Sequence, residues 1–308
     1  MESGKHRIFA VTLNWNSFGV VCECIQSLQR SEQTVEKIVV VDNASADGSG
    51  KRLAQEYAND HRIAVVRNNS NEGFARAVNR GIALAMSEGA THVFLLNNDA
   101  EIDKNCLTEL IKGLSTDINA GAASPTVFYK NRPTLIWQAA GYFRYLRANV
   151  VVPEKNRKLE GARGGPREVT FLSGCALLMT EKMVTDIGLF DTDFFFYGED
   201  VEFSLRAIRK GYKLLYVPSA SAWHQIDDVE SSRSSPYVMY HRARSAVLLY
   251  RKSFKWLFSC YAILIHLVLY TPYRLWQCRL SEGPFRSFGG WIRGTIDALF
   301  SPPRNWVG

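Results

Sequence analysis

The sequence predicts an α/β fold in which a mostly parallel sheet is flanked by helices and followed by a helical C-terminal region. Two observations predict this class. Short runs of apolar residues end abruptly in polar ones, as buried strands do, and the stretches between them carry apolar residues at helical spacing. A regular alternation of strand and helix builds a parallel sheet with right-handed crossovers, so the polar strand ends collect along one edge.

Four apolar runs carry this pattern through the first hundred residues. Each leads into asparagine, aspartate or arginine, and we expect strands at 8–13, 38–41, 63–66 and 94–96. Ahead of the fourth run, a set of apolar residues shares one face of an expected helix: Phe74, Ala77, Val78, Ile82 and Ala85. In open α/β sheets, ligands bind at the carboxyl edge that such strand ends form.

The fourth run carries the strongest chemical signal, because amides and acids follow it directly: Asn97, Asn98, Asp99 and Glu101. A buried carboxylate without a partner is too costly, so Asp99 must face water, pair with a cation or hold a metal. A turn or cap explains a lone acid after a strand, but the surrounding polar residues favour a site for a metal or for hydroxyl groups. One or two carboxylates together with substrate phosphates are a typical magnesium environment.

A second acidic pair, Glu199 and Asp200, stands at the start of another expected helix. Capping is the simpler explanation of such a pair, because negative charge at a helix N-terminus gains about 0.3–1 kcal/mol. The aromatic run at 194–197 directly before the pair instead favours a walled pocket. The positive helix end should keep Asp200 ionised. His224 follows a further apolar strand and is either structural or the residue that completes a metal site at Asp99.

Length and composition allow one large α/β domain with an appendage. The chain has 308 residues, 46% of them hydrophobic, and a net charge of +7. Its six cysteines are scattered without a C-x-x-C pair, which argues against zinc, iron–sulfur and disulfide-scaffold classes. The first strand follows no apolar leader, so we expect a reducing, cytosolic setting, in which the sequons at Asn43 and Asn68 are chance matches.

Much of the excess positive charge lies late in the chain, around an apolar run at 256–273 that has no acidic or basic residue. As a helix this run is roughly 27 Å long, slightly short of the about 30 Å hydrocarbon core. Its flanks suit a helix lying on an anionic membrane surface: Arg251, Lys252, Lys255, Trp256, Arg274, Trp276 and Arg279. We expect peripheral or monotopic attachment to the cytoplasmic face of the inner or plasma membrane. The alternative is a buried helix packed on the rest of the protein.

Motifs of several enzyme classes are missing from the sequence. The glycines at 48 and 50 lack the third glycine of a dinucleotide-binding loop, and the chain has neither a Walker A loop nor a G-x-S-x-G elbow. These absences argue against NAD-dependent enzymes, P-loop nucleotidases and α/β-hydrolases.

Taken in order, the motifs resemble those of the family 2 glycosyltransferases of the GT-A fold, and most of all the bacterial rhamnosyltransferase branch. The resemblance covers roughly residues 7–250. Each matching segment is weak alone, but together and in this order they make a strong signal: 11–16, 40–45, 71–75, 96–99, 171–175, 188–191, 197–202 and 223–224.

The resemblance implies a donor site built from the strand ends. Asp42 would bind the imide of a pyrimidine base, and Asn14 and Asn71 lie in segments that match the donor-binding motifs. Asn98 and Asp99 occupy the D-x-D position of the family, with asparagine where many members have aspartate. Asn98 or Asn97 would then contact the ribose.

The resemblance also implies the metal site and the catalytic residues. Asp99 would hold a divalent cation, Mg²⁺ or Mn²⁺, that bridges the donor diphosphate. His224 is similar to a histidine that completes the coordination in some members. Asp200 would be the general base, and Glu199 a supporting acid beside it.

These parts together predict an inverting, metal-dependent glycosyltransferase. Such an enzyme needs one base for the acceptor hydroxyl and one cation for the leaving nucleoside diphosphate, and it needs no covalent nucleophile. The expected donor is dTDP-L-rhamnose, and the expected acceptor is a polyprenyl-diphosphate-linked or other cell-envelope glycan. We expect a catalytic domain over 1–235, with a nucleotide-sugar half to about 127 and an acceptor half after it, and a membrane-associated helical region over 236–308.

Three alternatives remain at this point. A UDP-sugar donor such as UDP-N-acetylglucosamine, UDP-galactose or UDP-galactofuranose would suit the same fold. A sugar nucleotidyltransferase would need a loop rich in glycine and lysine after the first strand, and 14–18 has neither lysine nor a glycine cluster. The third alternative is a glycan-binding or assembly protein without catalytic activity.

Overall fold

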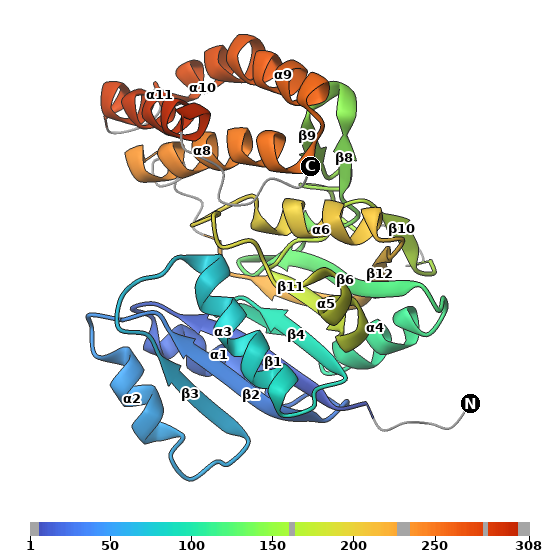
Figure 1. Ribbon diagram of the computed structural model, residues 1–308. Coiled ribbons are helices and arrows are strands. Elements are labelled where there is room, and N and C mark those ends of the chain that lie inside the picture. Colours follow the sequence, from blue (N-terminus) through green and yellow to red (C-terminus); the bar gives the residue numbers. More distant parts are fainter. Residues whose placement is uncertain (1–5, 160–163, 227–234, 280–282, 301–308) are drawn as a thin grey trace.

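The computed structural model describes residues 6–159, 164–226, 235–279 and 283–300. A twisted sheet with helices on both faces forms the larger part of the molecule, and a group of C-terminal helices lies at one end of it (Figure 1). The main sheet has the strand order β10-β12-β6-β11-β4-β1-β2-β3. The predicted α/β fold with a mostly parallel sheet is confirmed.

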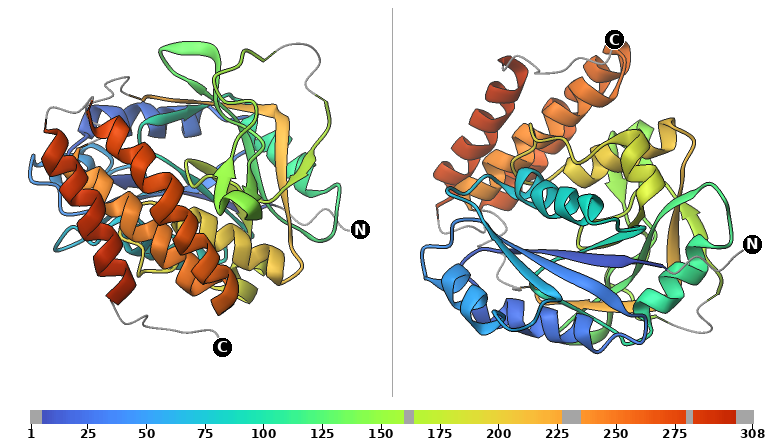
Figure 2. Two further views of the ribbon diagram at one scale, coloured as in Figure 1. Left: turned by 90° about the horizontal axis from the view of Figure 1, so that it is seen from above. Right: turned by 60° about the horizontal axis from the view of Figure 1, so that its bottom comes forward.

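The first four strands form the parallel half of this sheet and match the four predicted runs: β1 (Ile8–Asn14), β2 (Val35–Asp42), β3 (Ile63–Arg67) and β4 (His92–Leu96). Their apolar side chains alternate between two clusters on opposite faces of the sheet. One face is covered by α1 (Phe18–Gln29) and α2 (Ser49–Glu56), the other by α3 (Phe74–Ser87), as Figure 2 shows.

The second half of the sheet is mixed. β11 (Ala176–Thr180) runs antiparallel between β4 and β6 (Ala120–Tyr129), and β12 (Lys213–His224) runs parallel to β6. Shorter strands complete this half and the hairpin beside it: β5 (Ala100–Ile102), β7 (Arg132–Gln138), β8 (Tyr142–Arg144), β9 (Asn149–Val151) and β10 (Arg167–Val169). The helices of this half are α4 (Cys106–Leu114), α5 (Glu181–Ile187) and α6 (Glu199–Arg209). No sequence pattern predicted α5, whose N-terminus is capped by the side chain of Thr180.

The described part of 236–308 is helical, as predicted. It consists of α8 (Pro236–Ser253), α9 (Trp256–Ile265), a π-helical turn at His266–Tyr270, α10 (Thr271–Cys278) and α11 (Pro284–Phe300). The backbones of α8 and α11 approach closely because Gly290 and Gly294 of α11 face the backbone of α8. A Cβ atom at Gly294 would lie 2.2 Å from the carbonyl oxygen of Tyr240. Figure 1 shows this group of helices beyond α6, away from β1–β3.

Candidate active site

The ends of β1 and β2 place the first two predicted site residues side by side. Parallel pairing sets Asn14 opposite Asp42, and the Nδ2 of Asn14 donates a hydrogen bond to Asp42 Oδ1 at 2.8 Å. The same Nδ2 lies 2.8 Å from the hydroxyl oxygen of Ser49, at the start of α2. All three side chains are buried, so the carboxylate is held in a fixed orientation.

Asp42 has one oxygen with no hydrogen-bond partner among the described residues. Its side chain is fully buried, yet Oδ2 receives no hydrogen bond, and the Nε of Arg67 lies 3.6 Å away. Gly50 packs directly against this oxygen, because a Cβ atom there would stand 2.1 Å from it. An unsatisfied buried acceptor is costly. The site therefore suits a ligand that brings an N–H group to Asp42.

Three asparagines order the neighbouring loops. Asn43 donates to Asn71 Oδ1 at 2.9 Å, and Asn68 donates to Asn43 Oδ1 at 2.9 Å. The backbone N–H of Gly73 also donates to Asn71 Oδ1, at 3.0 Å. Asn71, predicted to bind the donor, thus holds the turn before α3 with its side-chain oxygen. The sequon residues Asn43 and Asn68 are both buried in this network.

The predicted metal residues Asp99 and His224 meet in the structure. Antiparallel pairing of β5 with β12 sets His224 opposite Ala100, and His224 Nε2 lies 2.8 Å from Asp99 Oδ1. The side chain of Asn97 lies 3.4 Å from the same nitrogen. Within the described part of the chain, no group of three or more His, Cys, Asp or Glu side chains could hold a metal ion. A cation at Asp99 would therefore draw further ligands from its substrate, which is usual for magnesium.

His224 is largely buried between Trp137 and the strand ends. Its ring lies 4.5 Å from that of Trp137, edge to face. Burial alone would lower the pKa of His224, but its contacts with Cys175 and Asp99 raise it to about 10. Because metal ligands must be deprotonated, a bound cation would compete with this proton. Asn98, the neighbour of Asp99, instead donates to the Ser17 hydroxyl at 2.6 Å, at the start of α1.

The acidic pair Glu199 and Asp200 begins α6 after an unusual turn. Tyr197 and Gly198 both have positive φ angles, 69° and 86°. This conformation is strained for a bulky residue such as tyrosine, and strain of this kind is concentrated at functional sites. It fixes where α6 begins and hence where the two carboxyls lie.

The two carboxyls differ in their hydrogen bonds. Asp200 accepts from the backbone N–H groups of Gly174 at 3.3 Å and of Val201 at 2.9 Å. Glu199 Oε2 has no hydrogen-bond partner among the described residues. Burial raises the pKa of Asp200 to about 6. Burial, with the charge of Asp200, raises the pKa of Glu199 to about 8. Desolvation thus raises the pKa of Asp200 in spite of the positive helix end, but a pKa of about 6 still leaves this carboxyl mostly ionised at neutral pH.

A buried lysine ties the loop before this pair to the C-terminal helices. Lys252 on α8 forms ion pairs with Asp191 and, at 2.7 Å, with Asp193. Its side chain is only 8% exposed. Burial alone would lower the pKa of Lys252, but the two carboxylates raise it. Asp191 is therefore occupied as a structural anion and is not free to accept a proton from a substrate.

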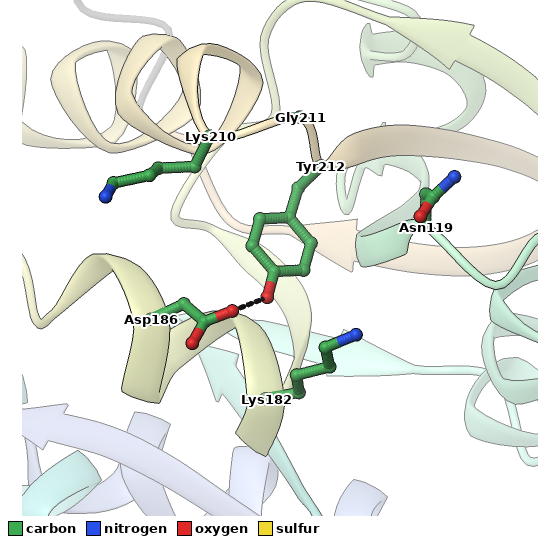
Figure 3. Close-up of a pocket in the computed structure, with 6 residues that line it drawn as sticks. All are labelled: Asn119, Lys182, Asp186, Lys210, Gly211 and Tyr212. Carbon is green, nitrogen blue, oxygen red and sulfur yellow. Dashed lines mark hydrogen bonds between the residues drawn. The ribbon is translucent and has the colours of Figure 1, made fainter.

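A pocket lies away from the residues described above. It has a volume of about 310 Å³ and is lined by the residues drawn in Figure 3, among them Lys182, Lys210 and Tyr212. Tyr212 donates to Asp186 there. Since Thr180 at the start of α5 pairs with His92, the first residue of β4, this pocket lies at the opposite edge of the sheet from Asp99.

Two serines of the site, Ser17 and Ser49, were not predicted from the sequence. Both lie at the start of a helix that follows a strand, and this position was the signal from which they could have been predicted. Six of the predicted residues lie in three pairs. Asn14 and Asp42 make direct contact, and so do Asp99 and His224, while Glu199 and Asp200 come from α6.

Comparison with known proteins identifies the family. The sequence model of Glycosyl transferase family 2 matches residues 10–188. The chain is 27% identical over 221 residues to the N-acetylglucosaminyl-diphospho-decaprenol L-rhamnosyltransferase of Mycobacterium tuberculosis, covering 65% of this chain and 70% of that protein. It is 25% identical over 226 residues to the dTDP-rhamnosyl transferase RfbF of Shigella flexneri, covering 70% and 71%.

A solved structure agrees with the fold. The mannosyltransferase PcManGT from Pyrobaculum calidifontis, in complex with GDP-Man and Mn²⁺, matches with a TM-score of 0.60 and 16% identity, over 98% of this chain and 89% of that chain. Together with the family match and the named relatives, this confirms a glycosyltransferase on the fold predicted from the sequence. The chain belongs to glycosyl transferase family 2 and to its rhamnosyltransferase-like branch.

Proposed function

We propose that this enzyme transfers L-rhamnose from dTDP-L-rhamnose, with inversion, to a polyprenyl-diphosphate-linked glycan. The names of the two relatives support the sugar and, in the mycobacterial protein, a lipid-linked acceptor. The observation that carries the proposal for this chain is the Oδ2 of buried Asp42, which accepts no hydrogen bond from the described residues. A pyrimidine imide N–H would satisfy it with a charge-assisted hydrogen bond, a strong class of interaction.

The donor diphosphate lies, in this proposal, over Asp99 and His224. A divalent cation, Mg²⁺ or Mn²⁺, bound there would neutralise the charge that develops on the leaving nucleoside diphosphate. Asp99 and His224 are suited to hold it, since carboxylate and imidazole are both metal ligands and lie 2.8 Å apart. Asn97 and Asn98 lie in the same segment and would contact the ribose.

Asp200 is the proposed general base. With its pKa raised to about 6, Asp200 is mostly ionised at neutral pH and more basic than an ordinary aspartate. Glu199, with its pKa raised to about 8, is mostly protonated at that pH and would donate a hydrogen bond to the acceptor. The two carboxyls thus divide the roles of proton acceptor and hydrogen-bond donor.

A UDP-sugar is the second candidate donor, because uracil presents the same imide to Asp42 as thymine does. A panel of dTDP-rhamnose, UDP-N-acetylglucosamine and UDP-galactose, each with Mn²⁺, Mg²⁺ or chelator, tests the choice by thermal shift and by sugar transfer. A ligand at a hundredfold excess over its Kd stabilises the folded state by about 2.7 kcal/mol. We expect dTDP-rhamnose to give the largest shift. Preference for a UDP-sugar would replace the rhamnose donor, and a lack of response to every nucleotide sugar would contradict the donor site.

We also propose peripheral or monotopic attachment to the cytoplasmic face of the membrane through α9 and α10. The helical run Trp256–Cys278 has the length and composition of a membrane span, although a core helix can pass the same test. Only 17% of its most apolar window is buried, which argues against a core helix. Trp256 and Trp276 are exposed on it, and aromatic rings of this kind favour membrane interfaces. Protein that stays fully soluble on fractionation at low salt without detergent would refute the attachment.

A further inference from the structure

A second cavity lies where the catalytic domain meets the C-terminal helices. It has a volume of about 230 Å³, and its walls come from the start of α6, the β8–β9 hairpin, α8, α10 and α11. Gly198 and Val201 line it, and in the chain these residues flank the carboxyl pair Glu199 and Asp200. The cavity therefore borders the same first turn of α6 that carries the proposed base.

Two arginines face this cavity from different helices. Arg274 on α10 lies with its Cζ 5.6 Å from the ring centroid of Trp291, and Arg242 on α8 lies 5.1 Å from that of Tyr197. The two aromatic rings also line the cavity. A guanidinium group that stacks on an aromatic ring binds planar anions through its N–H edge.

Arg274 lacks a compensating charge. One terminal N–H group of Arg274 donates to the side-chain oxygen of Gln277. No carboxylate lies within ion-pair distance of Arg274 among the described residues, and its buried Nε has no hydrogen-bond partner there. Burial, followed by the positive charge of Arg242, lowers the pKa of Arg274. A partly buried guanidinium beside a second one is costly unless an anion joins them.

The size of the cavity limits what that anion is. A volume of about 230 Å³ is below the roughly 300–1,000 Å³ of sites for drug-sized ligands, so it suits a small charged group and not a glycan. Arginine is the residue that binds phosphate groups bidentately. Beside Arg274 on the same helix, Tyr273 and Trp276 are exposed, so a chain attached to the charged group could leave along an apolar surface.

We propose that this cavity binds the diphosphate of a prenyl-diphosphate-linked acceptor through Arg274 and Arg242. The inference rests on the proposed function and adds the site that anchors the acceptor. Because Gly198 and Val201 line the cavity, a sugar attached to the bound diphosphate would lie beside the first turn of α6, the turn that carries the proposed base Asp200. Fixing the acceptor in this way lowers the entropy cost of bringing the two substrates together.

The first test measures binding without any sugar transfer. Full-length protein in detergent micelles is titrated calorimetrically with farnesyl diphosphate, farnesol and inorganic pyrophosphate, with chelator present to keep the diphosphates from a cation-dependent donor site. We expect farnesyl diphosphate to bind and Arg274→Gln to weaken it about ten- to hundredfold, the loss of one charge-assisted hydrogen bond. Arg274→Lys keeps the charge but lacks the planar guanidinium group, so its affinity for farnesyl diphosphate should lie between those of wild type and Arg274→Gln.

The control is Arg293→Gln on α11, which removes the same charge from a side chain that is 78% exposed and does not line the cavity. It should leave farnesyl diphosphate binding unchanged. Equal losses in Arg274→Gln and Arg293→Gln, or farnesol binding as tightly as farnesyl diphosphate, would overturn the proposal. Binding that disappears in Asp99→Ala would assign the diphosphate to the donor site instead. Should Arg274→Gln fail to fold, Arg242→Gln carries the same expectation.

The second test measures transfer. With farnesyl-diphospho-N-acetylglucosamine as acceptor, Arg274→Gln should raise KM by about ten- to hundredfold, while KM for octyl N-acetylglucosaminide, which has no phosphate, stays as in wild type. An equal rise for both acceptors contradicts the proposal. If wild type transfers no sugar to either acceptor, the proposed function fails, and the calorimetric result still decides whether the cavity binds the diphosphate.

Discussion

The proposed donor edge, at the ends of β1, β2 and β4, and the proposed acceptor side, at the start of α6, hold their carboxylates in different ways. At the donor edge, Asp42 is fixed by Asn14 from the adjacent strand and lies near the cationic Arg67. On the acceptor side, Glu199 and Asp200 begin a helix after a strained turn, and burial raises the pKa of both. Strand ends thus give a rigid binding surface, whereas a buried helix start gives groups that exchange protons near neutral pH.

The largest expected effect is on the acceptor side. Asp200→Asn removes the proposed base while it preserves the shape of the side chain, so turnover should fall by about 10²–10⁴-fold. Affinity for dTDP-rhamnose should change little, since the proposed base acts on the acceptor. Side-by-side assays of transfer and donor binding check this. Transfer near the wild-type rate would place the base elsewhere, and Asp191 is a poor replacement because Lys252 engages it.

The corresponding change at the donor edge should weaken binding of the donor. Asp99→Ala removes the carboxylate proposed to hold the cation, a contribution of several kcal/mol, so metal-dependent affinity for the donor should fall at least about 100-fold. Chelator should weaken donor binding to wild type and have little further effect on the variant. Calorimetry with Mn²⁺ and with chelator measures both. Unchanged affinity in the presence of metal would contradict the assignment of Asp99.

A third change tests how the C-terminal helices support the acceptor side. Lys252→Met leaves Asp191 and Asp193 without their buried cation, and we expect a loss of about 2–4 kcal/mol in unfolding free energy. Denaturant titration measures it, with Lys255→Met, an exposed lysine on the same segment, as the control. Equal stability of the two variants would show that the ion pairs do not hold this loop.

The smallest expected effect concerns Glu199. Its pKa is raised in the folded state, so the protonated form stabilises the fold at low pH, and this contribution is lost as pH rises through about 8. Glu199→Gln removes that loss. The Tm of Glu199→Gln minus the Tm of wild type should therefore grow by a few degrees from pH 5 to pH 9. A change of 1 kcal/mol in unfolding free energy shifts Tm by about 2–4 °C. A difference in Tm that is independent of pH would mean that Glu199 does not titrate in this range.

The same shifts predict a pH profile for transfer. Activity should rise with pH on a limb near 6 as Asp200 loses its proton. Asp200→Asn should abolish this limb in the residual activity. A limb that persists in the variant would belong to another group.

The donor edge was largely predictable from the sequence, because its residues follow the ends of strands that all run parallel. Apolar runs ending in Asn14, Asp42 and Asp99 belong to strands that pair directly or through one neighbour. Parallel pairing then brings their ends together without further information. The acceptor side was less predictable, since the sequence shows an acidic pair beside aromatic residues but not how deeply either acid is buried.

By itself, the sequence determined the α/β alternation, the edge where polar residues gather, and the residue types available for the chemistry. Only the tertiary structure decided which distant residues meet. It pairs His224 with Asp99 across 125 positions, engages Asp191 with Lys252, and turns Arg242 and Arg274 toward one cavity. The physical reason is that strand and helix patterns are local, whereas burial and charge pairing depend on packing between segments far apart in the chain.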